Sequence, residues 1–281
     1  MPALEEKDVE QLLRPLIRTR TVLETAQPPP ETRTRKRRRQ RHAVPPPVPA
    51  QPLTREVVAT RFGGLPTVEE GETWPLCDGC ADDLRFVAQV DYARDGLHDR
   101  LPIAFFTFFY CWNCHPWGRD HERGGWLVRS YTELRRPKVL VHGTEPDFTE
   151  PGFDERHAVP RLAKSLPDWG GLRLHCPELW ALGRDDYGFQ NWVDRAALKL
   201  TQELALRPHM RNAGVALGGY PHWVHDFDVT PLCTECARPM ELLLQIRPTE
   251  LTDAMWGDVG TLYLFMCRTH TRRTGLRMQC T

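Results

Sequence analysis

Short apolar runs along the chain predict β-strands, and these runs come in two similar pairs. The first pair covers Leu84 to Val90 and Ile103 to Tyr110, and the second covers Met240 to Ile246 and Leu262 to Met266. Runs of about four to eight residues that are rich in aromatic and branched side chains are typical of buried strands. The pattern therefore predicts antiparallel sheets in two separate parts of the chain.

Two further segments have apolar residues at helical spacing. Residues 5–24 predict a helix that is kinked at Pro15, because proline lacks a backbone N–H. Residues 185–206 predict a second helix whose apolar residues share one face, namely Trp192, Val193, Ala196, Leu200 and Leu204. Strands and helices together indicate an α+β fold, with paired antiparallel sheets and flanking helices.

The composition changes between residues 27 and 52, which contain PPP, a basic run and PPPVPAQP. Such a segment buries too little apolar surface to offset the entropy of ordering it, so we expect a disordered linker. The chain is therefore divided into an N-terminal helix (1–26), this linker and a folded domain (53–281). Within the domain, the Pro- and acid-rich residues 145–160 are expected to form a loop.

The folded domain repeats itself at a shift of 156 residues. PLCDGCA at 75–81 matches PLCTECA at 231–237, and the same shift aligns Gln89 with Gln245. A GG-x-P turn precedes each motif, one residue out of step. This self-similarity predicts two tandem homologous units, at residues 61–131 and 216–281. A helical and loop region at residues 132–215 is expected between them.

Each predicted unit carries two pairs of metal-ligand residues, and thirty residues separate the pairs in both units. A C-x2-C turn presents two thiolates from one tight loop, and two such pairs complete the four-ligand shell that zinc prefers. A redox C-x-x-C motif would open a helix, whereas a strand follows here. We therefore expect two structural zinc ions, held by Cys77, Cys80, Cys111 and Cys114, and by Cys233, Cys236, Cys267 and His270.

The apolar runs and the number of cysteines indicate in which compartment the protein is expected. The longest apolar run, residues 101–112, is shorter than the roughly 20 residues of a membrane span, and the acidic N-terminus has no apolar leader. Nine cysteines without a secretion signal point to a reducing compartment, so we expect a cytoplasmic protein without a membrane partner.

The net charge of zero hides an asymmetry. Arg33 to Arg41 (RTRKRRRQR) carries seven positive charges, so the remainder of the chain is negative by the same amount. The basic run is either a solvated tether or a contact for nucleic acid or an acidic protein surface.

The sequence contains no G-x-S-x-G, Walker or GxGxxG motif. The one candidate for a hydrolytic site is the pair His222 and His225, with Asp226 and Asp228 close by. Histidines at this spacing in a loop are more often packing or surface residues, so we expect no enzymatic activity.

Gln89 and Gln245 follow apolar residues at equivalent places, and a buried amide needs hydrogen-bond partners. They either satisfy neighbouring backbone or form the polar floor of a cleft between the units. In the second case they would contact a partner together with Trp223, because large aromatic residues dominate interface energetics.

Several sequence blocks together resemble the bacterial YwqG-like family: FGGLP, WPLCDGC, LRFVAQVDY, SLPDW, GGYPHWV and LYLFMC. The resemblance covers roughly residues 53–281. The family is a domain of unknown function, distantly related to the programmed-cell-death-2 and ribosome-maturation proteins. The resemblance implies a duplicated, largely β fold without known catalysis, and roles in chaperoning a ribosomal protein or in immunity against toxins.

These observations favour a non-catalytic, zinc-stabilised protein-binding module, of the immunity or client-chaperone type. An acidic folded part suits a basic partner, such as a toxin or a ribosomal protein. Two alternatives stay open: a nucleic-acid-associated protein that uses residues 33–41 and the zinc knuckles, and a hydrolase built on His222 and His225.

Overall fold

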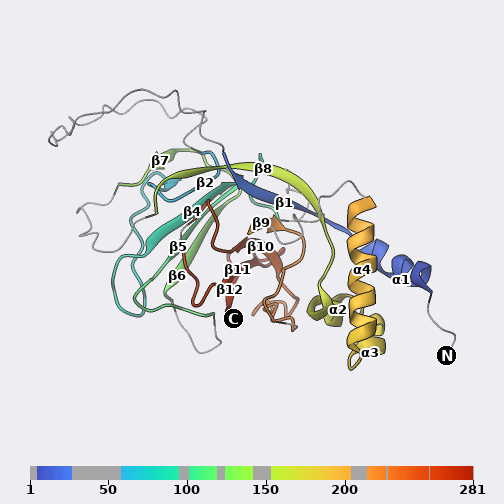
Figure 1. Cartoon of the computed structure of the whole chain (residues 1–281). Helices are drawn as coiled ribbons and strands as arrows, with labels where there is room; N and C mark the ends of the chain where they lie inside the picture. Colours follow the sequence, from blue (N-terminus) through green and yellow to red (C-terminus); the bar gives the residue numbers. More distant parts are fainter. Residues whose placement is uncertain are drawn as a thin grey trace, which may run out of the picture.

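A ten-stranded sheet forms the centre of the protein (Figure 1). The computed structural model describes residues 5–26, 58–94, 101–118, 124–141, 153–203, 214–225, 227–252 and 254–280. The strand order is β12-β11-β10-β9-β1-β8-β2-β4-β5-β6, and every neighbouring pair is antiparallel. The strands are β1 (Arg18–Thr25), β2 (Arg61–Phe62), β4 (Arg85–Asp91), β5 (Phe105–Tyr110), β6 (Trp126–Tyr131), β8 (Arg156–Ser165), β9 (Val215–Gly218), β10 (Glu241–Ile246), β11 (Thr261–Met266) and β12 (Thr274–Gln279).

The remaining elements are a small sheet and a group of helices. Strands β3 (Thr67–Glu69) and β7 (Pro137–Val139) pair with each other. The helices are α1 (Glu6–Leu13), the 3-10 turn η1 (Arg14–Leu16), α2 (Trp169–His175), α3 (Pro177–Gly183) and α4 (Tyr187–Glu203). The α-helices gather at one end of the molecule, beside β1 and β8, around a hydrophobic core of their own (Figure 1).

The sheet curls so that its two ends share one hydrophobic core. Phe106 and Phe108 of β5 belong to the same buried cluster as Leu262 and Leu264 of β11. The end strands also approach each other, since Ser130 of β6 donates a hydrogen bond to a carbonyl just before β12 (3.4 Å). The fold is therefore mostly β, with a sheet that comes close to a closed barrel.

The structure confirms the four apolar runs as strands β4, β5, β10 and β11, and residues 187–203 as helix α4. Alternate residues of these strands face opposite sides, as the period of a strand requires. Tyr263 and Phe265, for example, lie on the face opposite to Leu262 and Leu264.

The expected N-terminal helix over residues 5–24 is wrong beyond Leu13. The chain makes a 3-10 turn at Pro15, whose ring blocks continuation of an α-helix, and then enters strand β1. This strand is rich in threonine, which favours extended backbone, and it lies in the middle of the sheet. Pairing with β8 and β9 therefore outweighs the helical spacing of the leucines.

Two further expectations need correction. The sequence predicted two antiparallel sheets, one in each unit. The strands of both units belong to one sheet, because β1 and β8 lie between them and join them. The predicted loop at residues 145–160 already belongs to β8 from Arg156 onward. The predicted linker lies outside the described residues.

Deletion of residues 27–52 is expected to leave the melting temperature within about 2 °C of wild type. Ala26 donates a hydrogen bond to the carbonyl of His157 (3.0 Å), and Ala158 donates one to the carbonyl of Thr60 (3.1 Å). Both flanks of the deleted segment therefore lie at the same end of β8, about 10 Å apart on either side of it. The remaining five residues can span about 17 Å.

Differential scanning calorimetry of the two chains provides the measurement. A loss of more than about 5 °C would contradict the expectation that this segment contributes no packing.

Candidate metal centres

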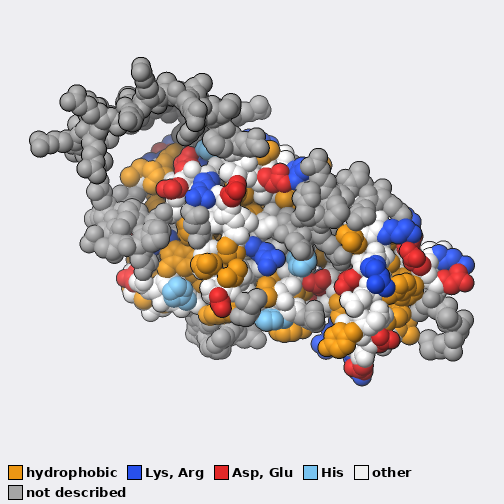
Figure 2. Space-filling view, viewed as in Figure 1, with side chains coloured by type: hydrophobic (Ala, Val, Ile, Leu, Met, Phe, Trp, Pro, Cys, Tyr) orange, Lys and Arg blue, Asp and Glu red, His pale blue; other side chains and the backbone are white. Residues whose placement is uncertain are grey.

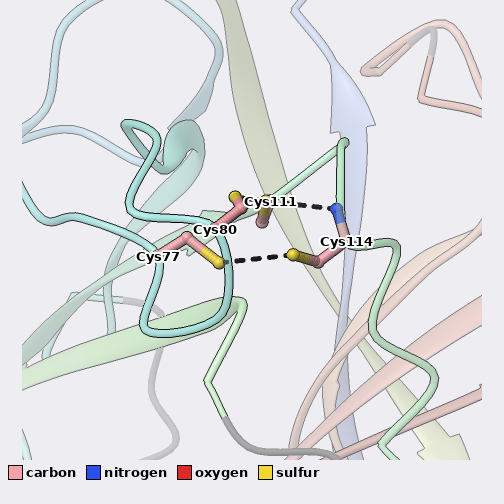
Figure 3. A group of neighbouring side chains, drawn as sticks. All are labelled: Cys77, Cys80, Cys111 and Cys114. Carbon is pink, nitrogen blue, oxygen red and sulfur yellow. Dashed lines mark hydrogen bonds between the residues drawn. The ribbon is translucent and has the colours of Figure 1, made fainter.

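The first cluster consists of four cysteines from two turns (Figure 3). Cys77 and Cys80 lie in the turn before β4, and Cys111 and Cys114 follow the end of β5. All four sulfur atoms lie within 4.8 Å of one another. The Sγ atoms of Cys77 and Cys114 are 3.6 Å apart, as are those of Cys80 and Cys111.

Local backbone hydrogen bonds shape the first turn. Ala81 donates to the carbonyl of Cys77 (2.8 Å), and Cys77 donates to the carbonyl of Asp82 (2.7 Å). Ala81 adopts a φ of 62°, in the left-handed region that non-glycine residues seldom occupy. This conformation bends the chain tightly enough to bring both thiols to one side of the turn. The N–H of Gly79 also points at the Sγ of Cys77 (3.4 Å).

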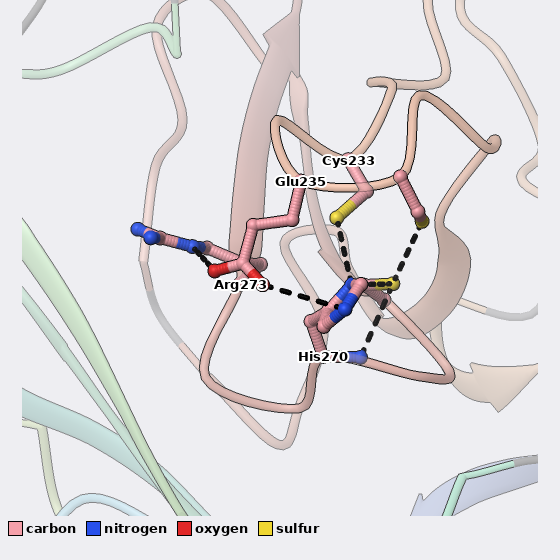
Figure 4. Close-up of polar contacts among 6 residues, drawn as sticks. Cys233, Glu235, His270 and Arg273 are labelled. Carbon is pink, nitrogen blue, oxygen red and sulfur yellow. Dashed lines mark hydrogen bonds and ion pairs between the residues drawn. The ribbon is translucent and has the colours of Figure 1, made fainter.

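The second cluster has the same plan with one histidine (Figure 4). The Sγ atoms of Cys236 and Cys267 are 3.7 Å apart. His270 Nδ1 lies 3.6 Å from the Sγ of Cys233 and 3.7 Å from that of Cys267. The turn is again closed by an alanine at positive φ, Ala237 at 53°, so the two clusters are built alike.

These distances match the edges of a tetrahedron around a metal ion. With metal–sulfur bonds of about 2.3 Å and metal–nitrogen bonds of about 2.05 Å, S–S edges measure about 3.8 Å and S–N edges about 3.5–3.6 Å. A disulfide would bring the sulfurs to about 2.05 Å, so the described thiols are not paired covalently. The structure thus brings together all eight predicted ligands in two sets, and each set could hold a metal ion.

Glu235 supports the second cluster from within the C-x2-C turn (Figure 4). Its carboxylate lies 3.4 Å from Nε2 of His270 and accepts a hydrogen bond from Nε of Arg273 (2.6 Å). A carboxylate at Nε2 favours the tautomer with the proton there, which leaves Nδ1 free to bind a metal ion. In the first cluster the equivalent residue is Gly79, where a Cβ would lie 3.2 Å from the Sγ of Cys114.

One thiol in each cluster is more acidic than an ordinary cysteine. Burial raises the pKa of Cys77, but backbone N–H groups of Cys80 and Gly79 and the neighbouring thiols outweigh burial and hold this pKa at about 7. In the same way, N–H groups of Glu235 and Cys236 outweigh burial and hold the pKa of Cys233 at about 6. Thiolates are the form that binds metal, so one cysteine of each cluster is substantially in its metal-binding, deprotonated form at neutral pH.

A small apolar cluster covers each set of ligands. Cys77 and Cys111 pack with Phe86 and Phe109, on the side of β4 and β5 that faces away from the shared core. Around the second set, the corresponding buried residues are Trp223, Met240, Leu242, Tyr263 and Phe265. Strands β4, β5, β10 and β11 are therefore buried on both faces, one against the shared core and the other against a ligand set.

The residues expected to contact a partner are buried. Gln89 accepts a hydrogen bond from the N–H of Thr67 (2.9 Å), and Gln245 accepts one from the N–H of His222 (2.8 Å). Trp223 is 4% exposed and lies against the ring of Tyr263. In this structure the two amides bond to neighbouring backbone and Trp223 packs on a neighbouring ring. That Gln89, Gln245 and Trp223 contact a partner stays a prediction.

Among the described residues, the histidine pair is not part of a group with metal-ligand geometry. The described residues contain two groups with metal-ligand geometry, and neither includes His222 or His225. The ring of His225 is exposed and stacks on Phe227 (5.4 Å between centroids). Asp226 lies outside the described residues.

Sequence analysis missed three polar residues: the half-buried Asp168, the exposed Glu235 and the buried Gln279. Asp168 accepts hydrogen bonds from Gly171 (2.9 Å) and Trp223 (2.9 Å), and burial raises its pKa to about 7. The block SLPDW before an apolar run is a helix-capping signal that could have identified it. No local pattern marks Gln279, whose partners come from residues 54 and 55 positions away.

Fold and clusters together define a mostly β protein with two sites of metal-binding geometry. A family model described as a domain of unknown function, DUF1963, matches residues 60–273. The chain belongs to this family. No match to the chain was found among curated proteins. In the described part of the chain, no helix is long and apolar enough to cross a membrane.

Replacement of Glu235 by alanine is expected to weaken metal binding at the second cluster by about 10- to 100-fold, because His270 loses the group that orients it. Glu235→Gln, which keeps an acceptor for Nε2, should lose less. The measurement is competition with a chromophoric chelator, and the first cluster serves as the internal control. Equal affinity of the Glu235→Ala protein and wild type would show that the carboxylate does not orient the ligand.

Proposed function

We propose that each cluster holds one structural zinc ion. The observation that carries this proposal is the closed set of four protein ligands with tetrahedral edges. Catalytic zinc sites keep one position for water, whereas both sets here supply all four ligands from the protein. Zinc at these places would tie the end of β5 to the turn before β4, and the end of β11 to the turn before β10.

We further propose that the two halves are homologous units and that the chain is YwqG-like. The strand order supports this, because β4-β5-β6 and β10-β11-β12 occupy opposite ends of the sheet. The β4–β5 pair shifts register between Phe86 and Ala88, and the β10–β11 pair shifts between Leu242 and Leu244, at aligned positions.

The proposed role is that of a non-catalytic, cytoplasmic protein-binding module for a basic partner, of the immunity or client-chaperone type. The chain outside residues 33–41 is acidic, which suits a basic surface. Two apolar side chains beside the clusters are accessible to a partner: Leu76 is 58% exposed and Leu232 is 59% exposed. They occupy equivalent places, one before each C-x2-C turn.

The two alternatives have less support. A nucleic-acid surface needs a basic stripe, but on the face in Figure 2 the described Lys and Arg side chains are interspersed with Asp and Glu. The basic run itself lies outside the described residues. A hydrolase would need the rings of His222 and His225 to converge on a reacting group, but the exposed ring of His225 stacks on Phe227.

The protein purified without chelator is expected to contain about two zinc ions per chain by elemental analysis. Cys267→Ser should reduce this to about one and lower the melting temperature by about 10 °C or more, because the metal contributes folding free energy. Cys176→Ser, in the helical core and remote from the ligand sets, is the control and should keep both ions. Native protein without zinc would contradict the proposal.

Affinity capture followed by reconstitution with the purified partner tests the binding role. The partner should be basic, and its association rate should fall about tenfold or more as salt is raised, since complementary charge steers the encounter. Leu76→Asp and Leu232→Asp should weaken the complex, whereas Tyr187→Asp, on α4, should not. An acidic partner, or binding that ignores both leucines, would refute the proposed mode.

A further inference from the structure

Strand β1 lies in the middle of the sheet, although it is remote in sequence from its neighbours there (Figure 1). It pairs with β8 and β9, whose residues lie more than a hundred positions away. The family model begins at residue 60, so β1 lies outside the matched part of the chain. Residues 27–57 connect it to the rest of the domain, and a tether of that length can reach about 100 Å when extended. The domain therefore completes its sheet with an element from outside the matched region.

The sheet holds β1 through backbone groups on both of its edges. Eight residue pairs join β1 to β8, from Arg18 with Ser165 to Thr25 with Ala158, and three pairs join it to β9. Both neighbours are antiparallel to β1, so β8 and β9 run parallel to each other. The position between them is thus shaped for one extended strand, and its main-chain hydrogen bonds supply affinity that depends little on sequence.

Side chains around this position add selectivity for sequence. Arg18 forms an ion pair with Glu241 (3.2 Å), and its guanidinium lies over the ring of Tyr220, 4.1 Å from the centroid. The hydroxyl of Tyr220 donates a hydrogen bond to the carbonyl of Leu16 (2.8 Å). Towards the other end of the strand, Leu23 is buried in the core that both halves share. The position therefore favours a strand that begins with a basic residue and carries an apolar residue near its end.

Helix α1 adds a second anchor for the same segment. Val9 and Leu13 are fully buried in the helical core, and Lys199 of α4 forms an ion pair with Glu10 (3.1 Å). These contacts, like those of β1, are made with residues that follow the tether in sequence. A separate peptide of residues 5–25 can therefore make the same contacts.

We propose that the sheet position between β8 and β9 is a binding site for an extended basic strand, which the chain fills with its own residues 18–25 and which the same residues of a second copy can fill. The tether raises the local concentration of the chain's own segment to about 1 mM, so this segment occupies the site when the protein is dilute. Exchange between two copies becomes measurable near that concentration, because the contacts are the same within one copy and between two. The site needs neither zinc nor a basic partner protein, so it can fail while the proposed function holds, and the reverse.

A peptide of residues 5–25 tests whether a separate segment fills the site. In the full chain, a protease recognition sequence within residues 27–52 allows the tether to be cut after folding. The fluorescent peptide, followed by anisotropy until the signal is constant, should bind the cut protein with a Kd of about 10 μM or tighter. It should bind the uncut protein at least about 100-fold more weakly, because the tethered segment competes at about 1 mM.

Two altered peptides test the recognition of Arg18. The Arg18→Glu peptide places a carboxylate beside Glu241 and should bind the cut protein at least about tenfold more weakly. The Lys7→Glu peptide carries the same reversal of charge at a side chain that is 70% exposed and pairs with the exposed Glu5. It is the matched control and should bind like the unaltered peptide.

A reciprocal charge reversal tests exchange between whole chains. Arg18→Glu and Glu241→Arg are made in two separate full chains, so each chain opposes like charges at its own site. In a mixture, each segment meets an opposite charge only in the other copy, which favours a reciprocal dimer. Sedimentation of the mixture should give a dimer with a Kd of about 0.1 mM, about tenfold tighter than the roughly 1 mM expected for wild type.

A single chain with both substitutions is the control, because it restores the ion pair within one copy and should dimerise no more than wild type. Near-UV circular dichroism verifies the fold of each chain, and the peptide titration depends on no substitution in the protein. Four results would overturn the proposal: no peptide binding to the cut protein, equal affinity for cut and uncut protein, unchanged binding of the Arg18→Glu peptide, or a mixture that dimerises no more than either variant alone.

Discussion

Pairing between β1 and β8 holds the two halves of this protein in one sheet. The ladder runs over eight residue pairs, from Arg18 with Ser165 to Thr25 with Ala158. On its other edge β1 pairs with β9, and β8 pairs with β2. Thus β8 borders the first half of the sheet at β2, and β1 borders the second half at β9. Without β1, the edges of β8 and β9 that face it would lose their backbone hydrogen-bond partners, so the N-terminal segment is part of the fold.

The curvature that follows from this joined sheet determines where the metal centres lie. Because strand residues alternate, one face of β5 and β11 faces the shared core and the other faces a ligand set. Both C-x2-C turns therefore lie outside the core, at strand ends. In this position a bound ion would fasten strand ends to neighbouring turns without entering the core, which fits a structural role.

The same closure of the sheet brings distant polar groups together around the segment after β9. Gln245, Gln279 and Asp168 come from different elements, and each accepts hydrogen bonds from backbone N–H groups of residues 222–225. The segment is consequently fixed by side chains from three distant elements.

The sequence by itself determined the ligand sets and strands β4, β5, β10 and β11. The ligand turns depend on hydrogen bonds between residues a few positions apart, and the buried strands on their own apolar composition, so local patterns suffice. Only the tertiary structure decided that residues 18–25 form a strand, since their pairing residues lie more than a hundred positions away. For the same reason, the burial of Gln89, Gln245, Trp223 and Gln279 was beyond the sequence. Whether a polar group is satisfied depends on which distant segments fold against it.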